Sequence, residues 1–367
     1  MQIDQAVRRL LQSLRQRLAG LLRGFRFRIP RIQLPRFALP RGIKLDWAGP
    51  GALLASLGSA FGGLGLRGNL SLAGGIAILA SLYYVGGAWV SSKVDADVKF
   101  EAPAAELLPG TSRAVAIAAA LIEREVPRWV PNDPFYKPTY ILHNMPNFQR
   151  GMLQAFQRVT IELNDQLGRT RGSSPTDPDL EKAAGDIRYS ADRWIWNADR
   201  WWAINLTAEE SYRRAAKELR AYNLRLATGQ ATFDHRADNL KETLDGIAND
   251  LGSTSGAIEQ FVQTSAGFPF NVRAARLFYR AKGQLYAFYM VLKELRVDVG
   301  DVLKEKNLEP TYAQMLESFE QAIRLNPAFV LNGNPDSQIF PNHLAIEGFY
   351  LLRARTQLRE ITSILQA

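Results

Sequence analysis

The sequence predicts an all-α protein in which a single transmembrane helix is followed by a helical bundle outside the membrane. Three observations lead to this fold class. Residues 68–92 contain no charged side chain. The segments on the two sides of this run differ sharply in charge. Beyond residue 109, apolar residues recur every three to four positions, which is the spacing of helices rather than of strands.

Charge divides the chain at the apolar run. Residues 1–70 contain 12 Lys/Arg against 2 Asp/Glu, whereas residues 93–367 contain 33 against 34. About 20 apolar residues suffice for a helix to cross a bilayer, and short flanks rich in Lys and Arg stay on the cytoplasmic side. The sequence therefore predicts a basic cytoplasmic arm (1–70), a transmembrane helix (71–92) and an all-α domain (93–367) on the far side. The run lies too far from the N-terminus for a cleaved signal peptide, so we expect an uncleaved anchor.

The arm contains two basic segments. In residues 3–22, apolar side chains recur at spacings of three and four with arginines between them, which is typical of a helix lying on an anionic leaflet; packing on its own domain or on a partner is the alternative. In residues 30–44 a proline recurs at every fifth position, which predicts either an extended strap that contacts lipid or a partner, or a semi-rigid basic linker. The arginines expected at the membrane surface are Arg8, Arg9, Arg15, Arg17, Arg31, Arg36 and Arg41.

Residues 48–66 are also uncharged but include six glycines. Glycine weakens a helix, so we expect an interfacial or flexible segment here. The alternative is a second span, which would return the large domain to the cytoplasm.

Inside the predicted span, small residues form a stripe at four-residue spacing: Ala73, Ala77 and Ser81. Such a stripe permits close pairing of two helices and hence a homo-oligomer; small residues that face lipid are the alternative. Tyr83 and Tyr84 lie toward the outer end, where amphipathic rings prefer the interface.

The far domain is expected to consist of helices at residues 112–129, 147–167, 271–296, 311–325 and 341–366, with three segments between them that show a seven-residue repeat. These segments cover residues 180–201, 212–226 and 233–261. The short linker 228–230 predicts that the second and third run antiparallel as neighbours. We expect a bundle core, with a projecting coiled-coil hairpin as the alternative, and we expect Trp194, Trp196, Trp201 and Trp202 to fill the core.

Composition excludes several kinds of site. The chain has no cysteine, so a disulfide framework, a cysteine zinc site and a thiol nucleophile are excluded. The net charge of +9 is confined to the arm, which carries no aromatic-rich nucleic-acid module, so we expect no nucleic-acid partner. Motifs of metallohydrolases, serine hydrolases and phosphate-binding loops are absent from the sequence. We expect no cofactor and no metal site.

Two loops rich in Pro, Asn and His supply the candidate polar residues, which are Asp133, His143 and His343. If these residues converge, they would form the site of an enzyme or a ligand-binding module. The alternative is helix capping, because Asn147 and Asn342 stand where N-caps are expected.

Five segments together resemble a family of bacterial inner-membrane proteins known as domain of unknown function 2333. They are Trp-Val-Pro-Asn-Asp (129–133), the run 144–151 from Asn-Met-Pro-Asn to Arg-Gly, Arg-Gly-Ser-Ser (171–174), Val-Leu-Asn-Gly (330–333) and Pro-Asn-His-Leu (341–344). The likeness covers residues 75–367. It implies an envelope protein of a proteobacterium with one span and a mostly helical periplasmic domain, and it transfers no catalytic residue. We therefore expect a scaffolding or protein-interaction role, with anionic lipids and an envelope protein as partners.

Overall fold

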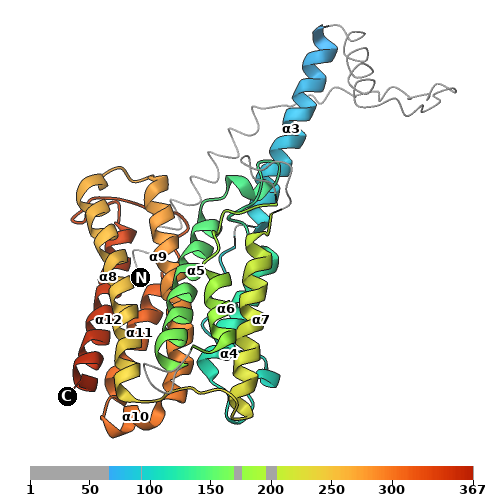
Figure 1. Ribbon diagram of the computed structural model, residues 1–367. Coiled ribbons are helices and arrows are strands. Elements are labelled where there is room, and N and C mark those ends of the chain that lie inside the picture. The colour runs from blue at the N-terminus through green and yellow to red at the C-terminus, as the bar shows by residue number, and fades with distance from the viewer. Residues whose placement is uncertain (1–65, 92, 169–175, 196–204, 367) are drawn as a thin grey trace, which may run out of the picture. The chain divides into compact units, whose positions relative to one another are not determined.

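The computed structural model describes residues 66–91, 93–168, 176–195 and 205–366 (Figure 1). By contacts the chain divides into two units, Met1–Leu70 and Ser71–Ala367. The segments predicted to meet the membrane surface in the arm, including their arginines, lie outside the described residues. In the described part of the second unit all regular structure is helical apart from an isolated bridge between Asn332 and Asn342, which confirms the all-α class.

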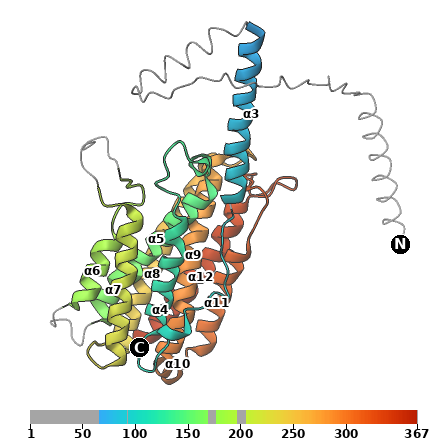
Figure 2. The same ribbon diagram turned by 90° about the vertical axis from the view of Figure 1, so that its right-hand side faces the viewer.

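The second unit is a bundle of helices of unequal length (Figures 1 and 2). Shorter 3-10 turns at Val126–Arg128 and Pro138–Ile141 and a π-turn at Leu163–Leu167 link some of them. Within the described residues, no helix combines the length and apolarity that a membrane crossing requires. The helices are α3 (Leu66–Ser91), α4 (Arg113–Glu125), α5 (Asn144–Glu162), α6 (Pro178–Ile187), α7 (Ala208–Ala227), α8 (Ala237–Ser265), α9 (Val272–Asp298), α10 (Gly300–Glu305), α11 (Glu309–Arg324) and α12 (His343–Gln366).

Side-chain caps fix where several helices begin. The sequence predicts Thr111 or Ser112 as the cap of α4, and it is the hydroxyl of Ser112 that accepts a hydrogen bond from the Val115 amide. The Asn342 side chain likewise accepts from the Ala345 amide and caps α12. The prediction for Asn147 was wrong: α5 begins at Asn144, and the Asn147 amide donates to the His143 carbonyl instead. Pro146 is the third residue of α5, and it is tolerated there because backbone amides in the first turn of a helix need no intrahelical partner.

The first heptad segment does not form one continuous helix. It was expected to run from residue 180 to 201, but α6 ends at Ile187. The chain then folds back, since the Asn205 amide bonds to the Ile195 carbonyl and the Ala208 amide to the Arg193 carbonyl. Trp194 is half-buried in this loop, and the other three tryptophans of the expected cluster lie outside the described residues.

The second and third heptad segments form α7 and α8, but these helices are not packed as a neighbouring pair. Helix α7 packs on α4 and α6, whereas α8 packs on α12. The connection 228–236 crosses one end of the bundle (Figure 1) and is held there by the Tyr222 hydroxyl, which donates to the Thr232 carbonyl at 2.7 Å. The heptad patterns therefore mark faces of a multi-helix bundle and not the seam of a hairpin.

Helix α9 is the centre of the bundle. It packs on α4, α5 and α11, and it is buried almost continuously from Phe278 to Leu295. Its closest neighbour is α5, and the two helices cross where Gly151 meets the backbone of Arg280 and Gly283 meets the backbone of Phe148. A Cβ atom at either glycine would overlap a carbonyl oxygen of the other helix. The crossing therefore requires glycine on both sides.

A buried acid lies between α12 and α9. Glu347 is fully buried, and neither carboxylate oxygen has a hydrogen-bond donor among the described residues. Lys282 of α9 is also buried and donates to the Leu325 carbonyl at 2.6 Å. Burial raises the pKa of Glu347 well above 4.5, and the charge of Lys282 offsets only part of this effect.

We predict that Gly283→Ala destabilises the protein by about 1–3 kcal/mol, because the added methyl group overpacks the crossing. Gly256→Ala is the matched control, since this helical glycine of α8 has no atom within 4 Å of an added Cβ. It should stabilise by about 0.5–1 kcal/mol, the usual gain of alanine over glycine in a helix. Chemical denaturation of both variants measures the difference, and equal effects would contradict the close crossing.

We predict that Glu347→Gln becomes increasingly stabilising relative to the unmodified chain as the pH rises above about 4.5. The folded protein holds this proton more tightly than the unfolded chain, so stability is lost as the pH rises from the unfolded pKa to the folded pKa. Glutamine removes that dependence. The comparison must be between variants, because burial also raises the pKa of Glu162 to about 7.

Thermal unfolding between pH 4 and pH 8 measures the effect of Glu347→Gln. Glu360→Gln, at an exposed position of the same helix, is the control and should leave the profile unchanged. A stability difference between Glu347→Gln and the unmodified chain that does not vary with pH would show that Glu347 titrates alike in both states.

Candidate functional site

Three connections gather at one end of the bundle, which we call the α3 end. They are residues 129–143 before α5, 266–271 before α9 and 325–342 before α12 (Figures 1 and 2). Backbone bonds join the second to the third, from Gly267 to Asn332 and from Asn332 to Pro269, each at 3.0 Å. The first is joined to α3, as the hydroxyls of Tyr84 and Tyr83 donate to the Phe135 and Tyr136 carbonyls at 2.9 and 3.1 Å.

Buried asparagines hold these three loops in shape. Asn332 is fully buried and donates to the Ser265 carbonyl. Asn342 donates to the Gly333 carbonyl at 2.6 Å. In the first loop, Asn132 donates to the Arg193 carbonyl at 2.8 Å and to the Glu209 carboxylate at 2.7 Å. Burying an amide is favourable only when it is hydrogen-bonded, so these side chains fix loop geometry.

Two of the three predicted site residues meet in one open pocket at this end. Asp133 and His143 line a cavity of about 380 Å³ together with Arg150 and Arg276. The Asp133 carboxylate accepts hydrogen bonds from Lys137 at 2.5 Å and from the Thr139 hydroxyl. Because both of its carboxylate oxygens accept these hydrogen bonds, Asp133 stabilises its own loop and does not orient His143.

His143 faces a cation. Its Nδ1 lies 3.4 Å from the Arg276 guanidinium. Burial lowers the pKa of His143 below 6.5, and the charge of Arg276 lowers it further. The imidazole is therefore neutral at neutral pH and presents Nδ1 as an acceptor. Arg276 has no carboxylate partner among the ion pairs of the described residues, so its charge faces the pocket.

His343 does not line this pocket. Its Nδ1 accepts a hydrogen bond from the Leu331 amide at 2.9 Å and ties the third loop to the start of α12. Burial lowers the pKa of His343 as well. The three candidate residues therefore do not converge in one site, because His343 is hydrogen-bonded within its own loop.

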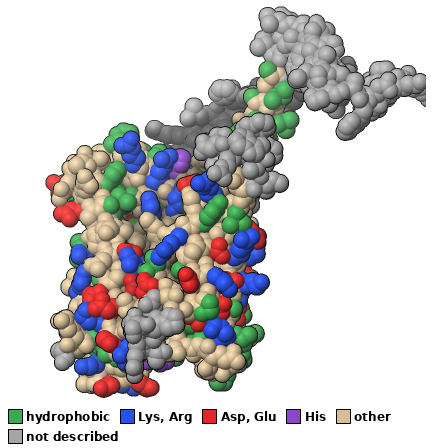
Figure 3. Space-filling model, in the orientation of Figure 1, with side chains coloured by type: hydrophobic (Ala, Val, Ile, Leu, Met, Phe, Trp, Pro, Cys, Tyr) green, Lys and Arg blue, Asp and Glu red, His purple; other side chains and the backbone are tan. Residues whose placement is uncertain are grey.

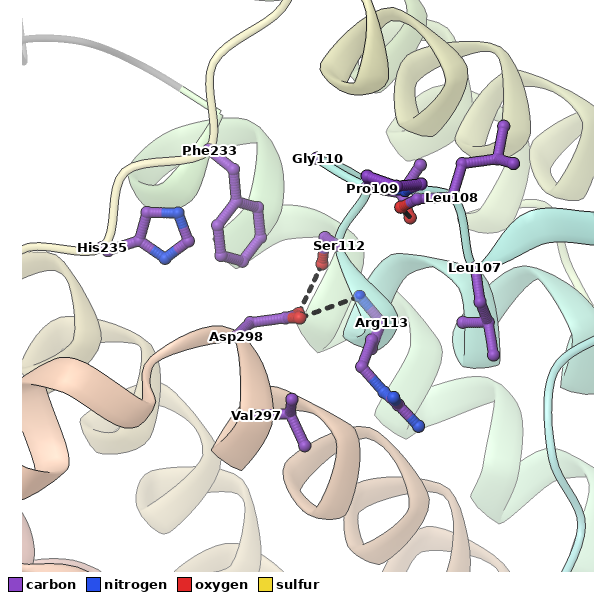
Figure 4. Close-up of a pocket in the computed structure, with 11 residues that line it drawn as sticks. Leu107, Leu108, Pro109, Gly110, Ser112, Arg113, Phe233, His235, Val297 and Asp298 are labelled. Carbon is purple, nitrogen blue, oxygen red and sulfur yellow. Dashed lines mark hydrogen bonds between the residues drawn. The ribbon is translucent and has the colours of Figure 1, made fainter. Parts of the chain in front are cut away.

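A second pocket lies at the opposite end, at the start of α4 (Figure 4). It measures about 460 Å³, and Asp298 points into it from the end of α9. The Asp298 carboxylate accepts from the Ser112 hydroxyl at 2.7 Å and from the amides of Arg113 and Ala114 at 2.9 and 3.0 Å. Its acceptor capacity is used at the helix N-terminus, so the residue fastens α9 to α4.

His235 lies at the rim of this second pocket (Figure 4). Helix α8 begins at Ala237, so His235 belongs to the preceding loop. Its side chain is exposed. Across the described residues, no group of three His, Asp or Glu side chains is arranged to hold a metal ion.

The small-residue stripe of α3 is exposed. Ala73, Ala77 and Ser81 are each open to the surroundings. The stripe is therefore accessible to a second helix, and the helix pairing stays a prediction.

Comparison with protein families gives one match. The family described as an uncharacterized protein conserved in bacteria (DUF2333) matches residues 77–268 and 269–367. The chain belongs to this family. No curated protein and no solved structure matches it.

The segments that resemble the DUF2333 family occupy one region of the fold. Residues 129–133, 330–333 and 341–344 lie in or beside the loops of the α3 end, and 144–151 forms the start of α5. The fifth segment, 171–174, lies outside the described residues. These family segments account for loop geometry at the α3 end and for the glycine at the α5–α9 crossing.

Sequence reasoning missed Arg276, the cation that defines the pocket. It lies on the outer face of α9, 133 residues from His143, and an arginine on an exposed helix face carries no local signal. Only the parallel packing of α5 beside α9 brings the two side chains together.

We predict that Arg276→Gln raises the pKa of His143, because it removes a positive charge that disfavours the imidazolium. Histidine NMR over a pH titration measures it, and the chain contains only three histidines. His343 is the internal control, since its pKa is lowered by burial and not by Arg276. A pKa of His143 that stays unchanged in the variant would contradict the contact.

Proposed function

We propose that this protein is a membrane-anchored scaffold of the bacterial cell envelope. In this proposal residues 71–92 cross the inner membrane, the basic arm 1–70 lies on the cytoplasmic leaflet, and the helical bundle stands in the periplasm. The bundle offers its surface to an envelope partner and the anchor holds it at the membrane.

The observation that carries the proposal is the exposure of α3. Its large apolar side chains are open to the surroundings along more than two turns, with Leu79 at 68% and Val85 at 63%. A helix that is apolar on all sides is suited to protein interior or to lipid. No other helix of the described chain covers these side chains, so lipid is the surrounding that fits them. The apolar side chains concerned are Ile76, Ile78, Leu79, Leu82 and Val85.

Within the described residues no helix meets the length and apolarity of a membrane crossing, so the crossing itself is proposed from the length and charge of the sequence. The uncharged run 68–92, if helical throughout, is about 37 Å long at 1.5 Å per residue, against a hydrocarbon core of about 30 Å. The surplus of basic residues before it agrees with a cytoplasmic N-terminus.

The scaffold role is supported by how the polar side chains are used. The buried asparagines hold loops, Asp298 joins two helices, and Asp133 braces its own loop. General acid–base catalysis needs a titratable side chain held against a nucleophile or substrate, and the polar pairs described above are engaged with the fold itself.

A ligand-binding module is the second candidate. The observation in its favour is the pocket at which Arg276 and Arg150 meet the neutral His143. Replacing His143 by Ala separates the two: a scaffold keeps its function, whereas a binding module loses it with no loss of stability.

We predict that a periplasmic reporter, alkaline phosphatase, is active when fused after Ala367 and inactive when fused after Asp46. A fluorescent protein that matures only in the cytoplasm should show the reverse. Cytoplasmic activity at both positions would contradict the proposal and would favour two spans, with residues 48–66 as the second.

A further inference from the structure

We propose that the three loops of the α3 end form a lipid-docking surface that rests in the outer interface of the same bilayer that α3 crosses. This inference rests on the proposed anchor and goes further, because a span alone requires no contact between bundle and membrane. It makes the bundle a domain held flat against the membrane at one end.

Exposed apolar side chains gather in the three loops of the α3 end. Each of the three loops carries large ones open to the surroundings, with Ile339 at 81% and Phe329 at 73%. Large exposed apolar side chains gathered in one region mark interaction surfaces, unlike single ones scattered over a surface. The exposed apolar side chains of the three loops include Phe135, Tyr140, Phe268, Phe270, Phe329 and Ile339.

The 129–143 loop is attached to α3 at a depth inside the predicted membrane span. The 129–143 loop is bonded to α3 at Tyr83 and Tyr84, and Pro138 packs against Gly87. Tyr84 lies seven residues before Ser91, the last residue of α3, which is about 10 Å along the helix. Residue 92 is the outer end of the predicted span, so the loop is fixed to α3 inside that end and not beyond it.

The tyrosine contacts between α3 and the 129–143 loop suit a membrane–water interface. Tyrosine prefers the membrane–water boundary, where its ring is in an apolar layer and its hydroxyl finds a partner. Here both hydroxyls donate to loop carbonyls. Irregular backbone near hydrocarbon is tolerated only where its polar groups are bonded, and these two carbonyls are.

The α3 end also carries exposed positive charge. Arg273, Arg276 and Arg280 are exposed at the start of α9, directly after the 266–271 loop. Figure 3 shows Lys and Arg side chains gathered between apolar ones at the upper end of this face. Aromatic side chains flanked by arginines are typical of surfaces that meet anionic headgroups. Asp336 is the exposed acid of the third loop, so the cations outnumber it.

The absence of cysteine makes the test direct, since single cysteines can be labelled with an environment-sensitive fluorophore. The full chain is reconstituted in vesicles of phosphatidylethanolamine and phosphatidylglycerol with nitroxide-labelled lipids. Loop positions are Phe268→Cys, Phe329→Cys and Ile339→Cys. Matched exposed positions away from the α3 end are Leu224→Cys and Val297→Cys. Leu79→Cys reports on the anchor itself.

We predict that the three loop labels emit at shorter wavelength and are quenched by nitroxides near the headgroup, whereas Leu224→Cys and Val297→Cys are not. Leu79→Cys should be quenched by nitroxides deep in the acyl chains. Quenching at Leu79→Cys without quenching in the loops would overturn the docking surface and leave the anchor standing; the loops would then be open to a protein partner. No quenching at any position would overturn both.

A second variant tests the charge argument in a chain whose apolar loops are intact. Arg273→Gln with Arg276→Gln, added to the labelled Phe329→Cys chain, should reduce quenching in vesicles with phosphatidylglycerol. It should leave quenching unchanged in vesicles of phosphatidylcholine alone. Equal loss in both vesicles would show that the arginines support the fold of the loops and not their contact with lipid.

Discussion

The close crossing of α5 and α9 is the contact on which the rest of the bundle depends. Gly151 and Gly283 let the two backbones touch, and no side chain separates them. Phe148 and Tyr286 stack beside the crossing with their rings 5.9 Å apart. With α5 fixed in this way, α9 is enclosed by α4 and α11 on its remaining sides. The central position of α9 explains why it is buried along most of its length.

The same crossing determines what the protein presents at its α3 end. Helices α5 and α9 run in parallel, so their starts lie together and Arg276 reaches His143. The loops that precede α5, α9 and α12 are therefore brought to one end, where buried asparagines fix their shape. An end built from rigid loops can expose aromatic side chains without collapsing onto them. This is why the α3 end suits a surface role.

The polar chemistry of the bundle is directed inward. Ser112, Asp298 and Asn342 join or cap helices, and His343 holds a loop. Glu347 is the exception, an acid buried without a hydrogen-bond donor among the described residues. Its protonation state couples the packing of α12 on α9 to pH. These side chains hold the shape of the bundle.

The sequence predicts the all-α class, a Thr or Ser cap at the start of α4, the cap at Asn342 and the buried face of α7, because each depends on local spacing or on one side chain near its own backbone. The separation of α7 from α8, the end of α6 at Ile187 and the pocket that Asp133 shares with Arg276 but not with His343 follow from the tertiary structure. A heptad pattern predicts that one face of a helix packs on another helix, but it does not identify which helix. Partner choice depends on shape at distant positions, such as two glycines 132 residues apart, and that information exists only once the chain is folded.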